Sequence, residues 1–299
     1  MKDFMMNETR KTGPTKPPWL KKRLSSGHTY NKVVRLLREC SLHTVCEEAL
    51  CPNMGECFSK GTATFMILGD HCTRNCRFCA VPHGVPEPPD KEEPQKVANA
   101  VKELGLRYAV VTSVTRDDLP DGGARHFAET IFAIKNQNPG IQVEVLIPDF
   151  QGSEDDLKTV LAAAPHVLNH NVETVPRLYP QVRPQAFYHR SLQLIQRACR
   201  INPVVAAKSG LMLGLGETHD EVARALQDLL GAGCRLLTLG QYLAPSKDHH
   251  PIVAYVSPDE FLRWEKTAYE MGFKGVASGP FVRSSFHAGE LFQKISDIS

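Results

Sequence analysis

The stretch Thr62-Ala-Thr-Phe-Met-Ile-Leu-Gly69, followed almost at once by Cys72-Thr-Arg-Asn-Cys76-Arg-Phe-Cys79, decides the expected fold. Residues 62–69 form a short apolar run that ends at glycine, which is typical of a buried β-strand. The three cysteines follow at the carboxyl end of that strand. In parallel α/β folds, ligands bind at this edge of the sheet. We therefore expect the cysteine loop to belong to an active or binding site.

Strand-like and helix-like segments alternate after residue 61. The strand patterns are at 62–69, 108–113, 141–147, 167–171, 210–215 and 235–240, and the helical patterns are at 92–104, 124–136, 153–164, 189–200, 218–230 and 258–271. Such alternation predicts parallel strands joined by right-handed crossovers. Because six units do not reach the eight of a closed barrel, we expect an α/β fold. Its form is a partial (β/α)6 TIM-like barrel with N-terminal and C-terminal extensions. A doubly wound open sheet is the alternative.

Charge and hydropathy exclude several classes of protein. The 299 residues include 35 Lys or Arg and 33 Asp or Glu, for a net charge of +2. This balance argues against a basic nucleic-acid coat protein and against an acidic disordered chain. Apolar runs stay far below the ~18 residues that a membrane span needs. The sequence therefore predicts neither nucleic acid nor a membrane as a partner.

The charge is concentrated in the first 39 residues, which carry ten Lys or Arg and three acids. A solubilising arm, a docking surface for an acidic macromolecule and a mitochondrial transit peptide remain open as explanations. Met1 is followed by polar residues rather than by the apolar core of a signal peptide, so we expect a reducing, cytoplasmic location.

The chain has nine cysteines, and six of them fall into two trios. In a reducing compartment, clustered cysteines are more often metal ligands than disulfides. Cys40, Cys199 and Cys234 lie in or near helical apolar patterns, and we expect them to be small core residues. In the trio Cys72, Cys76 and Cys79, a structural zinc would need a fourth ligand, such as His71 or His83. A 4Fe–4S cluster held by three cysteines would instead leave one iron open for a substrate or cosubstrate.

The spacing C-x3-C-x2-C, with the aromatic Phe78 before the last cysteine, resembles the signature of radical S-adenosylmethionine (SAM) enzymes. The resemblance implies a 4Fe–4S cluster on Cys72, Cys76 and Cys79, whose open iron is chelated by SAM. One-electron cleavage of SAM would then give methionine and a 5′-deoxyadenosyl radical.

A second trio, Cys46, Cys51 and Cys57, lies upstream with the spacing C-x4-C-x5-C. With both trios together, residues 30–292 resemble the lipoyl synthase family. The stretches that carry this resemblance are 69–80 (GDHCTRNCRFCA), 112–124 (TSVTRDDLPDGGA), 169–177 (NHNVETVPR), 208–217 (KSGLMLGLGE) and 276–288 (VASGPFVRSSFHA). The resemblance implies an auxiliary 4Fe–4S cluster on the upstream trio. Its fourth ligand would be Ser285, in the motif Arg283-Ser284-Ser285, and the cluster would be dismantled as the sulfur donor.

The resemblance also implies a reaction and a division of the chain. Two sulfur atoms would be inserted at carbons 6 and 8 of an octanoyl-lysine on a lipoyl carrier domain, with methionine and 5′-deoxyadenosine as by-products. Carriers would be 2-oxoacid dehydrogenase acyltransferase subunits and glycine cleavage H protein, and the electron donor a reduced ferredoxin or flavodoxin. Residues 1–60 would form the basic arm and auxiliary-cluster segment, 61–245 the radical SAM barrel, and 246–299 the extension that supplies the serine.

Polar residues at the other strand ends are candidates for binding SAM. Asn171 and Glu173, two apart at the end of a strand pattern, point the same way and suit ribose hydroxyls; a capped turn is the alternative. Gly122 and Gly123 would permit close approach of a ligand. Cationic candidates for the SAM carboxylate are Arg177 and Lys208, either of which could instead be a solvated surface charge. The ligand of the SAM amino group stays open, with Asp117 and Asp118 as options.

Two other functions compete with this interpretation. Another sulfur-inserting radical enzyme, similar to biotin synthase, would share Cys72, Cys76 and Cys79 but lack the linked upstream trio. A metal-stapled nucleic-acid binder would use the basic arm, but that arm lacks interleaved aromatic residues and no known nucleic-acid module is evident.

Overall fold

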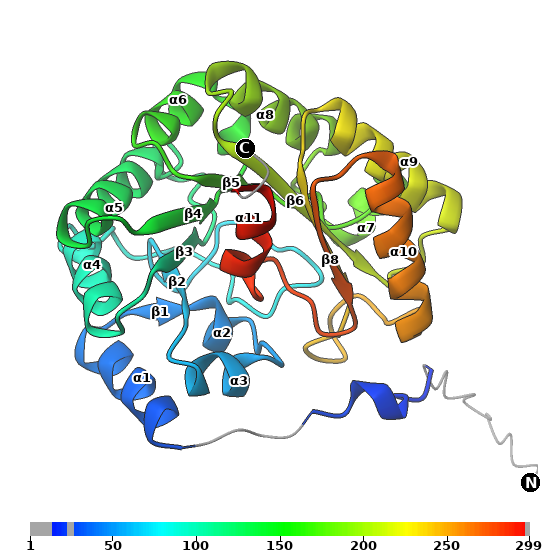
Figure 1. Cartoon of the computed structure of the whole chain (residues 1–299), viewed down its shortest axis with the longest axis horizontal. Helices are drawn as coiled ribbons and strands as arrows, with labels where there is room; N and C mark the ends of the chain where they lie inside the picture. The colour runs from blue at the N-terminus through cyan, green and yellow to red at the C-terminus, as the bar shows by residue number, and fades with distance from the viewer. Residues whose placement is uncertain (1–13, 23–26, 297–299) are drawn as a thin grey trace, which may run out of the picture.

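The computed structural model describes residues 14–22 and 27–296, and its centre is one curved sheet (Figure 1). The eight strands follow one another in chain order, β1 to β8, and β2 to β8 all pair in parallel. Among the strands of the described residues, only β1 runs antiparallel, against β2. The strands are β1 (His43–Thr44), β2 (Thr64–Ile67), β3 (Tyr108–Ser113), β4 (Gln142–Leu146), β5 (Val167–Asn169), β6 (Ala206–Leu213), β7 (Leu236–Gln241) and β8 (Gly275–Gly279).

Helices cover the outer face of this sheet (Figure 1). The covering helices are α4 (Glu93–Glu103), α5 (Ala124–Gln137), α6 (Glu154–Ala162), α8 (Tyr188–Ile201), α9 (His219–Gly231) and α10 (Pro258–Met271). The remaining helical segments are η1 (Pro18–Leu20), α1 (His28–Glu39), α2 (Val45–Glu48), α3 (Met54–Ser59), η2 (Phe150–Gly152), η3 (Pro176–Leu178), α7 (Tyr179–Val182) and α11 (Ala288–Ser296). No helix within 14–22 and 27–296 combines the length and the apolar character needed to cross a membrane.

The expected partial barrel is confirmed. The six predicted strands correspond to β2 to β7, and their order along the sheet excludes the doubly wound alternative, in which the strand order reverses. The sheet is larger than predicted, because β1 and β8 extend it at its two edges. The sequence of β8, Gly-Val-Ala-Ser-Gly, lacks the apolar run that identified the other strands. Parts of the basic arm, residues 1–13 and 23–26, lie outside the described residues.

Local chemistry explains why the covering helices begin where they do. Ser153 caps α6, and Ser257 caps α10, by accepting a hydrogen bond from the backbone N–H three residues ahead. Thr218 and Glu221 form a full capping box at the start of α9. Helix α10 covers the predicted range 258–271 and stops at Gly272, which adopts φ +118.

The end of the barrel at which the strands begin is plugged by α11. Leu291 on this helix packs against Val167, Ala206 and Leu236, the first residues of β5, β6 and β7. Above this plug, Lys208 on β6 and Glu144 on β4 form an ion pair of 2.7 Å, with both side chains fully buried. The same carboxylate accepts hydrogen bonds from Tyr108 and Asn169. The inside of the barrel therefore contains a polar layer centred on the Glu144 carboxylate, with partners from β3, β5 and β6.

We predict that Lys208→Met destabilises the protein by about 3–5 kcal/mol, because it leaves the buried Glu144 carboxylate without its cation. The double variant Lys208→Met, Glu144→Met should recover only part of that loss, because Tyr108 and Asn169 lose the acceptor that Glu144 gives them. The measurement is urea unfolding followed by far-UV circular dichroism under anaerobic conditions.

Lys158→Met is the matched control, because Lys158 forms its ion pairs on the surface with Glu154 and Asp155. Exposed pairs contribute about 0–1 kcal/mol. Equal unfolding midpoints for Lys208→Met and Lys158→Met would contradict the prediction.

Candidate active site

A cavity of about 1010 Å³ extends along the inside of the barrel and the loops that follow its strands. This is at the upper end of the range for small-molecule sites. Eleven of the predicted site residues line it: Cys46, Cys51, Cys57, Cys72, Cys76, Phe78, Cys79, Asn171, Glu173, Arg283 and Ser285. Residues from both ends of the chain thus share one cavity with the middle of the chain.

The loop with Cys72, Cys76 and Cys79 leaves β2 and is held mainly through its backbone. The N–H of Cys72 donates to Pro82 O at 2.8 Å, and the N–H of Gly84 donates to Cys72 O at 3.0 Å. On the far side, a ring nitrogen of His249 lies 2.9 Å from Cys79 O. Burial raises the pKa of the Cys79 thiol to about 12 and raises that of Cys76 as well. These thiols must therefore lose protons when they bind a metal centre.

The second trio lies on α2, on α3 and on the turn between them. The N–H of Cys51 donates to Cys46 O at 3.0 Å, which closes the turn. Burial raises the pKa of Cys46 to about 12 and raises that of Cys57. Both trios are therefore loops of thiols set into the wall of one cavity.

Contacts across the chain join the second trio to the Arg283-Ser284-Ser285 loop. Asn53 donates from Nδ2 to Phe281 O at 2.7 Å, and His287 lies 3.5 Å from Glu56. Lys22 forms an ion pair of 2.9 Å with Glu56 and lies 5.2 Å from the ring centres of Phe281 and Phe286. Hydrogen bonds from Lys22 and Lys60 hold the pKa of Glu56 at about 2. Four polar groups thus fix the serine loop against the cysteines of α2 and α3.

The serine loop also presses against β7. A Cβ on Gly240 would lie 2.1 Å from Val282 O, so only glycine permits this approach. On the barrel side, Asn171 donates to Ser284 Oγ at 2.7 Å. The neighbouring Ser285 lines the cavity.

The donor chemistry of the two trios fits iron–sulfur clusters. Three thiols per loop are soft ligands, and 4Fe–4S clusters are held by cysteine thiolates. In such a cluster each thiolate binds a different iron, so the sulfurs need not converge on one point. Within the described part of the chain, no three His, Cys, Asp or Glu side chains converge closely enough to hold a single metal ion.

Asn171 and Glu173 lie beside the first trio in a strained turn after β5. Glu173 adopts φ +65, and hydrogen bonds from its N–H to Gly210 O and from Met212 to its own O hold it there. Strain of this kind concentrates at ligand sites. Asn171 Oδ1 is buried, with no hydrogen-bond partner in the described residues. The described protein groups thus leave one buried acceptor unused beside Glu173.

Four predicted ligand-binding residues do not line the cavity. Lys208 is occupied by Glu144 inside the barrel, and the exposed Arg177 pairs with Glu221 at 2.7 Å. Gly122 packs against Phe150, and Gly123 caps α5 directly under Leu68. The two aspartates considered for the SAM amino group are engaged by arginines, Asp117 by Arg74 and Asp118 by Arg116.

Arg183 is the site residue that the sequence did not indicate. It follows α7 and lines the cavity, and its Nη1 donates to Asn171 O, Val172 O and Tyr179 Oη. Its Nε is buried without a partner among the described residues. An arginine twelve positions after Asn171 carries no sequence pattern, so only the fold reveals it.

Two family models match parts of this chain. The model of the radical SAM superfamily matches residues 66–229, and the model of the N-terminal domain of lipoyl synthase matches residues 2–51. Among solved structures, the chain resembles methylornithine synthase, with a TM-score of 0.54 at 13% identity over 81% of this chain and 74% of that one. It also resembles HydG, a maturase of the [FeFe]-hydrogenase, with a TM-score of 0.56 at 16% identity over 83% and 63%. These likenesses establish the fold.

Relatives that are closer in sequence establish the family. The chain is 56% identical to the lipoyl synthase of Caldanaerobacter subterraneus subsp. tengcongensis over 273 residues, which are 91% of this chain and 95% of that one. It is 55% identical to the lipoyl synthase of Chlorobaculum tepidum over 290 residues, or 96% and 99% of the two chains. With both cysteine trios and the serine loop in one cavity of a radical SAM barrel, the chain belongs to the lipoyl synthase family of radical SAM enzymes.

Proposed function

We propose that this chain inserts two sulfur atoms at carbons 6 and 8 of an octanoyl-lysine on a lipoyl carrier domain. By-products are methionine and 5′-deoxyadenosine, and the sulfur comes from an auxiliary 4Fe–4S cluster. The observation that carries the proposal is that both cysteine trios and Ser285 line a single cavity. When bound, the SAM cluster and SAM supply a radical strong enough to remove hydrogen from an unactivated C–H bond, which no side chain could do.

The first group of residues binds the radical source. Cys72, Cys76 and Cys79 would hold one 4Fe–4S cluster, and Phe78 lines the same cavity. Asn171 and Glu173 accept hydrogen bonds from the SAM ribose, and the buried, unpaired Asn171 Oδ1 supports this role. We assign the SAM carboxylate to Arg183, which lines the cavity, rather than to Arg177 or Lys208. Neither of those lines it, since Arg177 pairs with Glu221 on the surface and Lys208 pairs with Glu144 inside the barrel.

The second group supplies sulfur. Cys46, Cys51 and Cys57 hold the auxiliary cluster, and Ser285 is its fourth ligand. A serine oxygen is a hard donor among soft thiolates, which suits an iron that must be released. Arg283 donates from Nη1 to Val282 O at 2.7 Å and shapes the backbone on which Ser285 lies.

The remaining parts of the proposal concern the division of the chain and its partners. Residues 1–60, 61–245 and 246–299 form the auxiliary-cluster segment, the radical SAM barrel and the serine-bearing extension. Partners are octanoylated acyltransferase subunits or glycine cleavage H protein, with a reduced ferredoxin or flavodoxin as electron donor. We place the protein in the cytoplasm because free thiols on this scale require a reducing compartment.

The reconstituted protein should contain about eight iron atoms per chain, since two 4Fe–4S clusters are proposed. With octanoyl-lysine peptide, SAM and a reductant under anaerobic conditions, mass spectrometry should detect the gain of two sulfur atoms. The triple variant Cys46→Ala, Cys51→Ala, Cys57→Ala should retain about four iron atoms and cleave SAM without inserting sulfur. No gain of sulfur by the wild-type protein while SAM is cleaved would refute the proposed reaction.

Ser285→Ala should abolish most sulfur insertion while leaving SAM binding within about twofold, because only the auxiliary site loses a ligand. Ser284→Ala is the matched variant: it removes the neighbouring hydroxyl, which accepts from Asn171. Sulfur insertion and SAM affinity are measured side by side for the two variants. Normal lipoyl yield from Ser285→Ala would reject Ser285 as the ligand. Loss of sulfur insertion in Ser284→Ala but not in Ser285→Ala would reject it as well.

Arg183→Lys should weaken SAM binding by about 10- to 100-fold, because charge-assisted hydrogen bonds are worth about 1.5–3 kcal/mol. Arg177→Lys is the control, since Arg177 pairs on the surface with Glu221. Equilibrium dialysis of SAM against the anaerobic protein gives both constants. If Arg177→Lys weakens binding and Arg183→Lys does not, the assignment of the carboxylate is wrong.

A further inference from the structure

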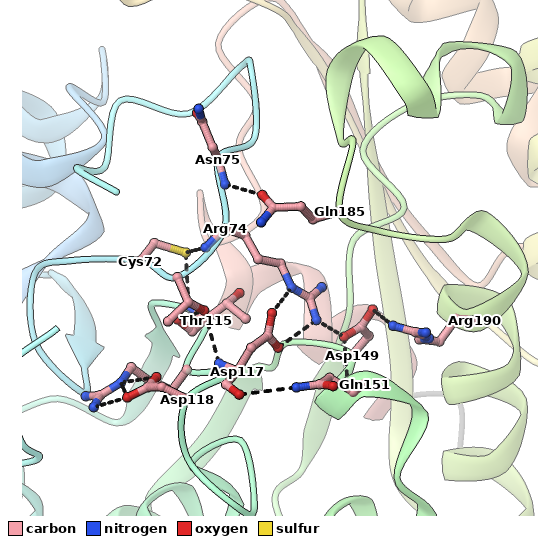
Figure 2. Close-up of polar contacts among 12 residues, drawn as sticks. Cys72, Arg74, Asn75, Thr115, Asp117, Asp118, Asp149, Gln151, Gln185 and Arg190 are labelled. Atoms are coloured by element: carbon pink, nitrogen blue, oxygen red, sulfur yellow. Dashed lines mark hydrogen bonds and ion pairs between the residues drawn. The ribbon is translucent and has the colours of Figure 1, made fainter. Parts of the chain in front are cut away.

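An ion network of four residues is attached to the first cysteine loop (Figure 2). Arg74, between Cys72 and Cys76, donates from Nε and Nη2 to the two carboxylate oxygens of Asp117, at 2.6 and 2.9 Å. Its Nη2 also donates to Asp149 at 2.6 Å, and Arg190 reaches the other oxygen of Asp149 at 3.5 Å. The side chains of Arg74 and Asp149 are 5% and 1% exposed. The network therefore fastens the loop after β2 to the segments after β3 and β4.

The network contains two cations, Arg74 and Arg190, and two anions, Asp117 and Asp149, so its formal charges cancel. Burial alone would raise the pKa of Asp149, but hydrogen bonds from Arg74 outweigh it and hold the pKa at about 2. Asp149 also accepts from the N–H of Gln151, and the Gln151 side chain donates to Asp117 O. A planar guanidinium that bridges two carboxylates fixes both distance and direction. Arg74 is thus held far more tightly than a surface arginine.

Next to this network, two backbone amides point at a cysteine sulfur (Figure 2). The N–H of Arg74 donates to Cys72 Sγ at 3.4 Å, and the N–H of Thr115 donates to it at 3.3 Å. Thr73 joins the two donors, since its hydroxyl donates to Thr115 O and accepts from the N–H of Asp117. The segment that carries the Thr115 N–H is therefore tied, through Asp117, to the side chain of Arg74. The N–H of Arg74 is the other donor.

Hydrogen bonds to cluster sulfurs, together with cluster charge and exposure, set the reduction potential of an iron–sulfur cluster. An N–H aimed at a thiolate stabilises the more negative, reduced state. The direction of the two amides depends on how the loop is held, and Arg74 holds it.

We propose that Arg74 is a positioning residue that keeps the amides of Arg74 and Thr115 directed at Cys72 Sγ and thereby sets the reduction potential of the SAM cluster. The inference rests on the proposed cluster at Cys72, Cys76 and Cys79. It is independent of the sulfur-insertion step, because it concerns only the cluster that responds to SAM.

Arg74→Lys separates positioning from simple electrostatics, because it keeps the charge and removes the fork. The reconstituted holoenzyme is titrated potentiometrically and followed by electron paramagnetic resonance, reading the signal that changes when SAM is added. At a fixed solution potential, we expect the ratio of reduced to oxidised cluster to fall about tenfold. This corresponds to a reduction potential lower by about 59 mV. Hydrogen exchange in peptides that cover residues 70–80 should rise, while iron content stays near that of wild type.

Asp117→Asn is the second variant, and for it the two explanations predict opposite signs. It adds a net positive charge near the cluster, so simple electrostatics predicts a higher potential. Positioning predicts a lower one, because the bidentate hold on Arg74 is weakened. Arg116→Lys is the matched control: Arg116 is also buried and donates to Asp118 and to Leu68 O, but its side chain forms no hydrogen bond or ion pair with Asp117 or Asp149. It should leave the potential unchanged.

An unchanged potential in Arg74→Lys, or a raised one in Asp117→Asn, would overturn the role of Arg74. Loss of the SAM-responsive signal from both variants would also overturn the proposal. The network would then determine whether the cluster binds at all, and not its reduction potential. Absence of that signal from the wild-type holoenzyme would instead refute the proposed SAM cluster.

Discussion

Seven strands that all run in the same direction are the constraint on which the arrangement of this site depends. Because β2 to β8 are parallel, their carboxyl ends share one rim, and each following loop begins there. The first cysteine loop follows β2, Asp117 follows β3, and Asp149 follows β4. The turn with Glu173 follows β5, and the Arg283-Ser284-Ser285 loop follows β8. Residues as distant in sequence as Cys72 and Ser285 therefore line the same cavity.

The opposite end of the barrel has a different task. Helix α11 and the Lys208–Glu144 layer fill the space where the strands begin, so this end of the barrel is closed by an ion pair and by apolar side chains. Charge is used differently at the rim, where Arg74, Asp117, Asp149 and Arg190 tie loops to one another. Both sets contain buried ion pairs, but the first lies between strands inside the barrel and the second joins loops at the rim.

The sequence predicted the parts of the molecule whose evidence is local. The apolar runs of β2 to β7, the bounds of α10, and the spacing of both cysteine trios could be found within a few residues. β8 escaped because its small residues lack that pattern, and β1 has only two residues. Lys208 and Arg183 could not be placed, because their roles depend on partners in other strands and turns. A lysine looks the same in sequence whether it faces a ligand or a buried glutamate 64 residues away.

The sheet ends at β1 and β8, and the open seam between these two strands affects how firmly the two ends of the chain are joined. No ladder of backbone hydrogen bonds joins those two strands within the described chain, so the contacts that cross there are those of Lys22, Asn53 and Glu56 with Phe281, Phe286 and His287. Each such contact is worth only about 0.5–1.5 kcal/mol. The segment with Lys22, Asn53 and Glu56 and the loop with Phe281, Phe286 and His287 can accordingly separate without breaking any strand pairing of the sheet.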